Sequence, residues 1–237
     1  MELDPLILSR IQFAFVVCFH AIFPVFTIGL ASTIAGFEVL HFKTDSLIWQ
    51  KLSKFWTQVF AVVFGIGVVS GIVMSFQFGT NWSNFSFATA NFLGPVLSYE
   101  VITAFFLEAT FLGVLLFGRD KVPKGAHLFA AIMVASGTFI SSFWILSANS
   151  LMQTPDGLEL IDGMYYVKSW SDALFTASFG YRFLHMALAS FLTAALVVAG
   201  VSAWFVLQKR ELEANQKALS IALWFLLILA PAQALVG

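Results

Sequence analysis

Charged residues and cysteine are both scarce in this chain of 237 residues. Only 11% of the residues are Asp, Glu, Lys or Arg, whereas 59% are hydrophobic and the mean hydropathy is +0.89. The single cysteine, Cys18, excludes a disulfide framework, and the lack of a Cys-x-x-Cys-His motif excludes a haem attached through thioethers. The N-terminus lacks the basic region of a signal peptide, because it carries Glu2 and Asp4. This composition excludes a soluble globular domain and indicates a polytopic helical membrane protein.

The chain has instead six apolar segments, each long enough to cross a bilayer as a helix. We expect these helices at residues 11–40, 55–78, 92–118, 126–150, 181–207 and from 219 to the end. The predicted fold is therefore all-α, a polytopic membrane helical bundle that forms one transmembrane domain over residues 1–237. In the loop before the fifth helix, Asp162-Gly163 predicts the tight turn of a short hairpin, and residues 170–179 are expected along the membrane interface. Because the sixth segment is still apolar at Gly237, we expect a fragment or a truncated product.

The basic residues predict how the helices are oriented. Nine of the 12 Lys and Arg residues fall in or beside the first, third and fifth connections between helices: Lys43, Lys51, Lys54, Arg119, Lys121, Lys124, Lys209, Arg210 and Lys217. Arg10, Lys168 and Arg182 fall on the other side. Since basic loops stay in the cytoplasm, we expect the N-terminus outside the cell.

Two carboxylates, Glu100 and Glu108, stand in the third apolar segment. An acid at the centre of a spanning helix costs about 3 kcal/mol even on lenient insertion scales, so such a side chain normally faces a bundle interior, a wet cavity or a partner. Eight residues of α-helix rise about 12 Å and turn the second side chain only about 80° from the first. The two acids could form a proton relay toward a buried reaction centre, or a polar pair that fixes helix packing.

Two of the four histidines also lie inside apolar segments. His20 and His185 are both expected in the outer half of the membrane, whereas His41 and His127 lie at helix ends, where a histidine is most often an interfacial polar group. Neutral imidazole is a common haem ligand in helical bundles, and a hydrogen-bonded core histidine is the alternative for each. Two imidazoles at matching depth favour two cofactors.

Other polar or small residues allow two interpretations. The stripe Gly67, Gly71, Ser75 and Gly79 suits close helix packing, or room for the face of a macrocycle. Arg10 and Arg182 flank the histidine helices and could pair with propionates or simply reach the membrane surface. Ser141 and Asn149 are polar groups in an apolar helix, for which hydrogen-bonded packing is the default.

Five motifs, in order along the whole chain, resemble a known family. They are Leu8-Ser-Arg-Ile-Gln-Phe-Ala-Phe with His20, Phe76-Gln-Phe-Gly-Thr-Asn-Trp, Glu100 with Phe106-Leu-Glu, Trp144-Ile-Leu-Ser-Ala-Asn-Ser-Leu-Met-Gln-Thr-Pro, and Arg182-Phe-Leu-His. Together they resemble the N-terminal portion of subunit I of the cytochrome bd quinol oxidases, in particular the cyanide-insensitive branch.

The resemblance implies a terminal oxidase that passes electrons from quinol to O₂ and makes water with protons from the cytoplasm. Its cofactors would be a low-spin haem b, a high-spin haem b, and haem d or a haem b in its place. His185 would ligate the low-spin haem iron, and His20 a high-spin haem iron, with haem d as the expected one. Glu100 and Glu108 would carry protons.

The resemblance also implies supporting roles, partners and a location. Ser141 and Asn149 would line or support the proton route, and Arg10 would contact a haem. The partners would be quinol, O₂, subunit II of the oxidase and membrane lipid, with no nucleic acid. The location would be the bacterial cytoplasmic (inner) membrane.

The family's quinol-binding loop and its remaining haem ligands would all fall beyond Gly237. This departure keeps two other hypotheses open, a truncated inactive product and a proton-conducting membrane protein without redox chemistry. The second of these explains the glutamates but gives His20 and His185 no function.

Overall fold

The computed structural model describes residues 4–237, so Glu2 of the signal-peptide argument lies outside the described residues. Its helices are α1 (Pro5–Thr44), α2 (Leu47–Gly79), α3 (Ser83–Ala88), α4 (Ala90–Glu100), α5 (Phe106–Phe117), α6 (Lys124–Gln153), α7 (Trp170–Leu174), α8 (Phe179–Leu207) and α9 (Leu212–Val236). A π-helical turn, η1 (Val101–Phe105), joins α4 to α5, and the strands are β1 (Leu158–Ile161) and β2 (Met164–Val167). Six helical stretches are long and apolar enough to cross a membrane. The predicted all-α membrane bundle is confirmed.

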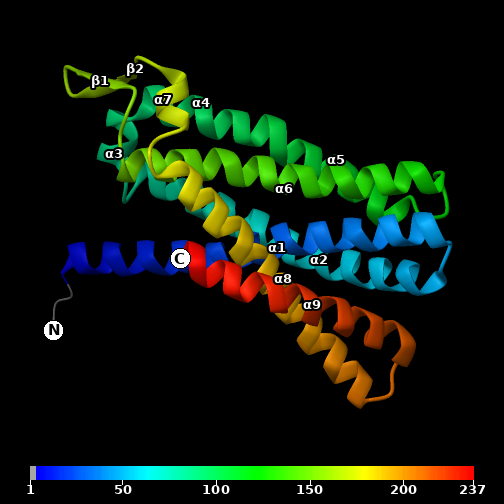
Figure 1. Ribbon diagram of the computed structural model, residues 1–237. Coiled ribbons are helices and arrows are strands. Elements are labelled where there is room, and N and C mark those ends of the chain that lie inside the picture. The colour runs from blue at the N-terminus through cyan, green and yellow to red at the C-terminus, as the bar shows by residue number, and fades with distance from the viewer. Residues whose placement is uncertain (1–3) are drawn as a thin grey trace.

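The long helices run side by side in an elongated bundle (Figure 1). Helix α1 is central, because it packs against α2, α6 and α8, while α5 packs on α6 and α9 on α8. The turns α1–α2, α5–α6 and α8–α9 lie at one end of the bundle, and the β-hairpin, α3 and α7 lie at the other (Figure 1). The nine basic residues counted above sit in or beside these three turns, so we call this the basic end.

Local capping explains where the first two helices begin. Asp4 accepts a hydrogen bond from the Leu6 amide at 2.9 Å, and Pro5 occupies the first helical position, where a missing N–H costs nothing. Ser46 caps α2 in the same way through the Ile48 amide. Between the two helices Asp45 adopts a left-handed conformation, with φ at 53°, which ends α1.

The predicted hairpin is also confirmed. β1 and β2 are antiparallel, with Ile161 opposite Met164, so only Asp162 and Gly163 form the turn. Both turn residues have positive φ, 50° and 81°, as a two-residue primed turn requires. The segment 170–179 contains α7, whose Ala173 is fully buried.

Two separate apolar cores hold the bundle together. The larger one lies toward the basic end and joins six helices, α1, α2, α5, α6, α8 and α9, with fully buried Leu30, Trp56, Phe60, Ala130 and Ala218 among its members. The smaller one lies at the hairpin end, around Phe92, Leu93, Val96, Ala148, Leu151 and Ala173. Neither core includes the middle turns of α1, α2 and α6, so these turns are where a cavity can form.

A buried polar cluster closes the basic end. Glu38 on α1 accepts a hydrogen bond from Arg119 at 2.5 Å and contacts the Nδ1 of His127 at 3.1 Å. Ser53 on α2 also donates to Glu38, and the His127 Nε2 lies 3.2 Å from the Leu115 carbonyl. The expectation that His41 and His127 are interfacial is wrong, because both are buried and hydrogen-bonded inside the bundle.

Candidate cofactor site

A cavity of about 520 Å³ occupies the gap between the two cores. Residues of α1, α2, α6 and α8 and of the α4–η1–α5 helix line it, and most of them are apolar. The exceptions include His20, Glu100, Glu108 and Ser141, all four singled out from the sequence. The structure therefore brings the imidazole, both carboxylates and one hydroxyl to a single interior site.

His20 reaches this cavity from α1, where its half-buried ring faces α2. Its Nδ1 lies 3.0 Å from the Ser70 hydroxyl. One turn further along α1, Pro24 also lines the cavity, and its missing N–H removes the helical hydrogen bond to the His20 carbonyl. The helix is thus locally loosened next to the imidazole.

The π-helical turn η1 sits between the two carboxylates. A π turn holds an additional residue within one helical turn and so changes the phase of everything after it. In an uninterrupted α-helix Glu108 would point about 80° away from Glu100; the π turn reduces this difference to about 10°. The predicted arrangement on one side of the helix is confirmed, since both acids line the same cavity, and the π turn improves their alignment.

The two carboxylates have different surroundings. Glu100 is half-buried and accepts a hydrogen bond from the Ser141 hydroxyl at 2.8 Å. Glu108 is only 6% exposed, and its Oε1 has no hydrogen-bond partner among the described residues. Gly137 on α6 makes space for it, because a Cβ at that position would lie 2.6 Å from the Glu108 Cγ. A buried carboxyl oxygen without a partner costs free energy, which points to a group or a proton that it serves.

The small-residue stripe of α2 allows close approach of side chains from α1. Gly67 allows close packing, since a Cβ there would lie 3.3 Å from the Phe23 Cβ. Gly71 faces the imidazole, and a Cβ there would lie 3.2 Å from the His20 Cε1. Ser75 lines the cavity, whereas Gly79 has open space around it.

Three of the predicted site residues lie outside the cavity lining. His185 is exposed on α8, where its ring nitrogens lie 3.1 and 3.2 Å from the Gln233 amide nitrogen of α9. Asn149 accepts a hydrogen bond from Arg182 at 3.0 Å, which ties α6 to α8 at the hairpin end. Arg10 is exposed on the first turns of α1.

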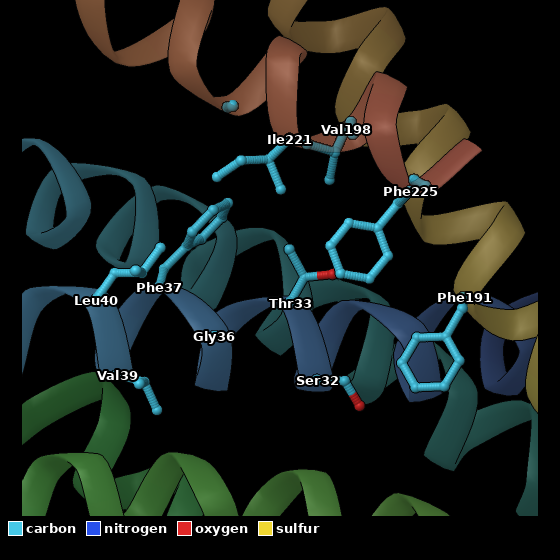
Figure 2. Close-up of a pocket in the computed structure, with 13 residues that line it drawn as sticks. Ser32, Thr33, Gly36, Phe37, Val39, Leu40, Phe191, Val198, Ile221 and Phe225 are labelled. Carbon is cyan, nitrogen blue, oxygen red and sulfur yellow. The ribbon is translucent and has the colours of Figure 1, made fainter. Parts of the chain in front are cut away.

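A second cavity, of about 360 Å³, lies between α1 and the α8–α9 pair. Figure 2 shows Thr33, Phe37, Ile221 and Phe225 around it. Its described lining holds no acid, base or histidine. The cavity therefore offers mainly apolar contact, with the hydroxyls of Ser32 and Thr33 as its polar side chains.

Sequence reasoning missed Ser70, Gly137 and Pro24. A serine or glycine inside an apolar helix is common, and nothing in the linear pattern says that it faces a particular side chain on another helix. Only Pro24 gave a usable signal, because a proline four residues after an intramembrane histidine alters the backbone at that histidine.

Long apolar helices around one interior imidazole and two carboxylates are the features of a multi-pass membrane protein with a candidate site in its bundle. A model of the family described as Cytochrome bd terminal oxidase subunit I matches residues 8–237. The chain therefore belongs to the cytochrome bd terminal oxidase subunit I family, and the resemblance stated above is confirmed.

Individual relatives agree with this assignment. The chain is similar to the cytochrome bd ubiquinol oxidase subunit 1 of Bacillus subtilis (strain 168), with 36% identity over 93% of this chain and 47% of that protein. It is 37% identical to the cytochrome bd-II ubiquinol oxidase subunit 1 of Escherichia coli (strain K12), over 88% of this chain and 41% of that protein. The bd oxidase structure from Geobacillus thermodenitrificans matches with a TM-score of 0.89 and 30% identity, over 99% of this chain and 54% of that one. The chain thus spans about half the length of these relatives.

Proposed function

We propose that this chain forms the haem-binding and proton-delivering part of a quinol oxidase, which passes electrons from quinol to O₂ and makes water. Membership of the family and the names of the relatives, which are ubiquinol oxidase subunits, support this function. The observation that carries the proposal is the shared cavity, because it joins His20 to Glu100 and Glu108 inside the membrane.

The residues of the cavity fit a haem. Its volume lies within the range of about 300 to 1,000 Å³ that is usual for cofactor pockets, and its walls are mainly apolar. In the described part of the chain no three His, Cys, Asp or Glu side chains gather to hold a bare metal ion. A porphyrin supplies four nitrogen ligands itself, so one imidazole suffices as the protein ligand. Gly71 lets the His20 ring approach α2 closely without a Cβ in the way.

A haem bound at His20 would supply the redox chemistry with O₂. The part left to this chain is to hold the group, keep bulk water out and deliver protons, which oxygen needs in the same number as electrons to become water. Phe64, Phe78 and Phe105 line the cavity and make it apolar, so protons must enter through particular carriers.

Glu108 and Glu100 are these carriers in the proposal. Glu108 is nearer to the basic end along the helix, and that end is cytoplasmic if the predicted orientation holds. A proton taken up at the Glu108 Oε1, which has no other partner, would move inward to Glu100. Ser141 donates to Glu100 at 2.8 Å and so fixes the position of the second carboxyl beside the cavity.

The remaining expected roles are part of the same proposal. His185 would ligate the iron of a separate low-spin haem b, in keeping with its place outside the His20 cavity. Arg10 would contact a haem at the outer surface, and Asn149 would act indirectly, by holding Arg182. The family's subunit II would be the partner chain, and the whole assembly would lie in the bacterial cytoplasmic membrane with the N-terminus outside.

The test compares two histidines of α1 in the assembled oxidase. His20→Gln should remove the absorption of one high-spin haem, whereas His41→Gln should keep the haem bands, because His41 bonds to the Ser46 carbonyl far from the cavity. Visible spectra before and after dithionite reduction measure this. Unchanged haem bands in His20→Gln would show that the ligand assignment is wrong.

A further inference from the structure

Ser70 is the hydrogen-bond partner of His20. The Ser70 Oγ lies 3.0 Å from the His20 Nδ1 and 2.9 Å from the carbonyl oxygen of Gly67, one turn earlier in α2. Ser70 is only 7% exposed, so water does not compete strongly for either bond. The three groups form a short chain from the imidazole to the backbone of α2.

The direction of these two bonds follows from proton counting. A carbonyl oxygen only accepts, and a hydroxyl group has one proton to donate. Both contacts can be hydrogen bonds at the same time only if the Ser70 hydroxyl donates to Gly67 and its oxygen accepts from the ring, and the His20 Nδ1 then carries a proton. In a neutral imidazole the other nitrogen, Nε2, then keeps its lone pair, which is the form that binds a metal.

We propose that Ser70 is a positioning residue for haem binding: it selects the Nδ1–H tautomer of His20 and so directs the lone pair of Nε2 to the iron. The inference rests on the proposed function, because it takes His20 as an axial ligand. Hydrogen bonds from the second nitrogen of a ligating histidine orient the ring and raise its basicity. Ser70 therefore also strengthens the donation of His20 to the iron.

Gly71 sets the ring position for this bond. A Cβ at Gly71 would lie 3.2 Å from the His20 Cε1 and 3.7 Å from Nδ1, so the imidazole lies close to α2 at a position without a side chain. A side chain at this position would crowd the ring and force a shift of a few tenths of an ångström. Neighbouring residues of one helix thus fix both the place and the protonation pattern of the ligand.

Ser32 provides a matched control on the helix that carries His20. It lies outside the lining of the His20 cavity, and its hydroxyl donates to the Ile28 carbonyl at 3.2 Å, just as Ser70 bonds to Gly67. The two serines differ in that Ser70 contacts His20. Loss of the Ser32 hydroxyl therefore tests for any general effect of a serine-to-alanine change in a bundle helix.

The experiment uses the complete oxidase and two readouts besides turnover. The iron–histidine stretching frequency of the reduced high-spin haem is measured by resonance Raman spectroscopy, and haem affinity by loss of haem on dilution in detergent. Ser70→Ala should lower the frequency and weaken haem binding about 10- to 100-fold, as loss of such partners does in metal sites. Ser70→Thr should restore both, since a helical threonine can make the same backbone bond, and Ser32→Ala should match the unmodified protein.

The outcomes separate this inference from the proposed function. If His20→Gln leaves the iron–histidine band in place, the proposed ligand is wrong. If His20→Gln removes the band but Ser70→Ala changes neither frequency nor affinity, the role of Ser70 is overturned and the haem assignment stands. Should Ser70→Ala fail to assemble, Gly71→Ala serves instead, and it should lower the frequency because the added Cβ crowds the ring and disturbs its bond to Ser70. An unchanged band in Gly71→Ala would also overturn the inference.

Discussion

At the scale of single residues, Glu108 combines burial with an unpartnered carboxyl oxygen. Glu108→Gln keeps the shape of the side chain but removes its ability to take up a proton. We expect turnover to fall about 100-fold or more, as for loss of a positioned proton carrier, while haem content stays the same. Oxygen consumption with quinol and the haem spectrum measure the two quantities.

A matched acid controls for the general effect of losing a carboxylate. Glu159 is exposed on β1 of the hairpin, far from the cavity in the chain, so Glu159→Gln should leave turnover unchanged. Equal rates in Glu108→Gln and the unmodified oxidase would contradict the proton route.

The site residues that could be predicted from the sequence are those whose side chains cost the most free energy in hydrocarbon, and the residues that were missed cost little there. His20, Glu100 and Glu108 could be found because an ionisable group is expensive in hydrocarbon and needs a reason to be there. Ser70 and Gly137 cost almost nothing in an apolar helix, so their roles depend on which side chain lies opposite. That information is long-range, since Ser70 and His20 are 50 residues apart.

At the scale of the elements, the helices of the fold could be predicted better than their ends. The apolar runs mark the membrane-crossing parts, but α2 begins at Leu47 instead of residue 55 and α9 at Leu212 instead of 219. The first turns of these helices are polar and so lie outside the apolar runs. In α2, for example, Ser46 caps the N-terminus, and Lys51 and Lys54 therefore lie inside the helix. The π turn could not be predicted, because residues 101–105 include no Gly or Pro that would mark an irregular helix.

The π turn gives a prediction of its own. Deleting Ile102, which is 63% exposed and outside the cavity lining, should remove the additional residue of the π turn and return the segment to α-helix. The two acids would then be seven residues apart, which leaves them within about 20° of the same direction. Turnover should therefore stay close to that of the control Ile102→Ala, which keeps the residue count; a deletion variant as slow as Glu108→Gln would contradict this description of the π turn.

At the scale of the whole molecule, the buried cluster at the basic end joins α1 to α2, to the α5–α6 turn and to α6. Removing one partner of a buried ion pair leaves the other charges uncompensated, which typically costs about 3–5 kcal/mol. Glu38→Ala should therefore lower the thermal unfolding midpoint markedly, since Arg119 and His127 lose their shared partner. The exposed pair of Lys51 with Glu211 is the comparison, and Lys51→Gln should shift the midpoint little. Equal shifts would contradict the structural role of the cluster.

An exposed pair between α1 and α6 predicts a dependence on pH. A hydrogen bond from Lys124, together with its charge, lowers the pKa of Asp45 below its usual value. The stabilisation by this pair is present above the usual Asp pKa of about 3.9 and is lost as the pH falls through the lowered pKa. Lys124→Gln should therefore lower the unfolding midpoint slightly at pH 7, and the difference should vanish in strong acid. A difference that grows on acidification would contradict the pairing.

The central claim is that one interior cavity holds a haem on His20, with Glu100 and Glu108 beside it. An experimental map of the assembled oxidase at side-chain resolution tests this directly. The account predicts porphyrin density in the cavity between α1, α2 and η1, with iron bonded to the His20 Nε2 and the Ser70 hydroxyl on Nδ1. A cavity filled by lipid, with the iron bonded elsewhere, would contradict it.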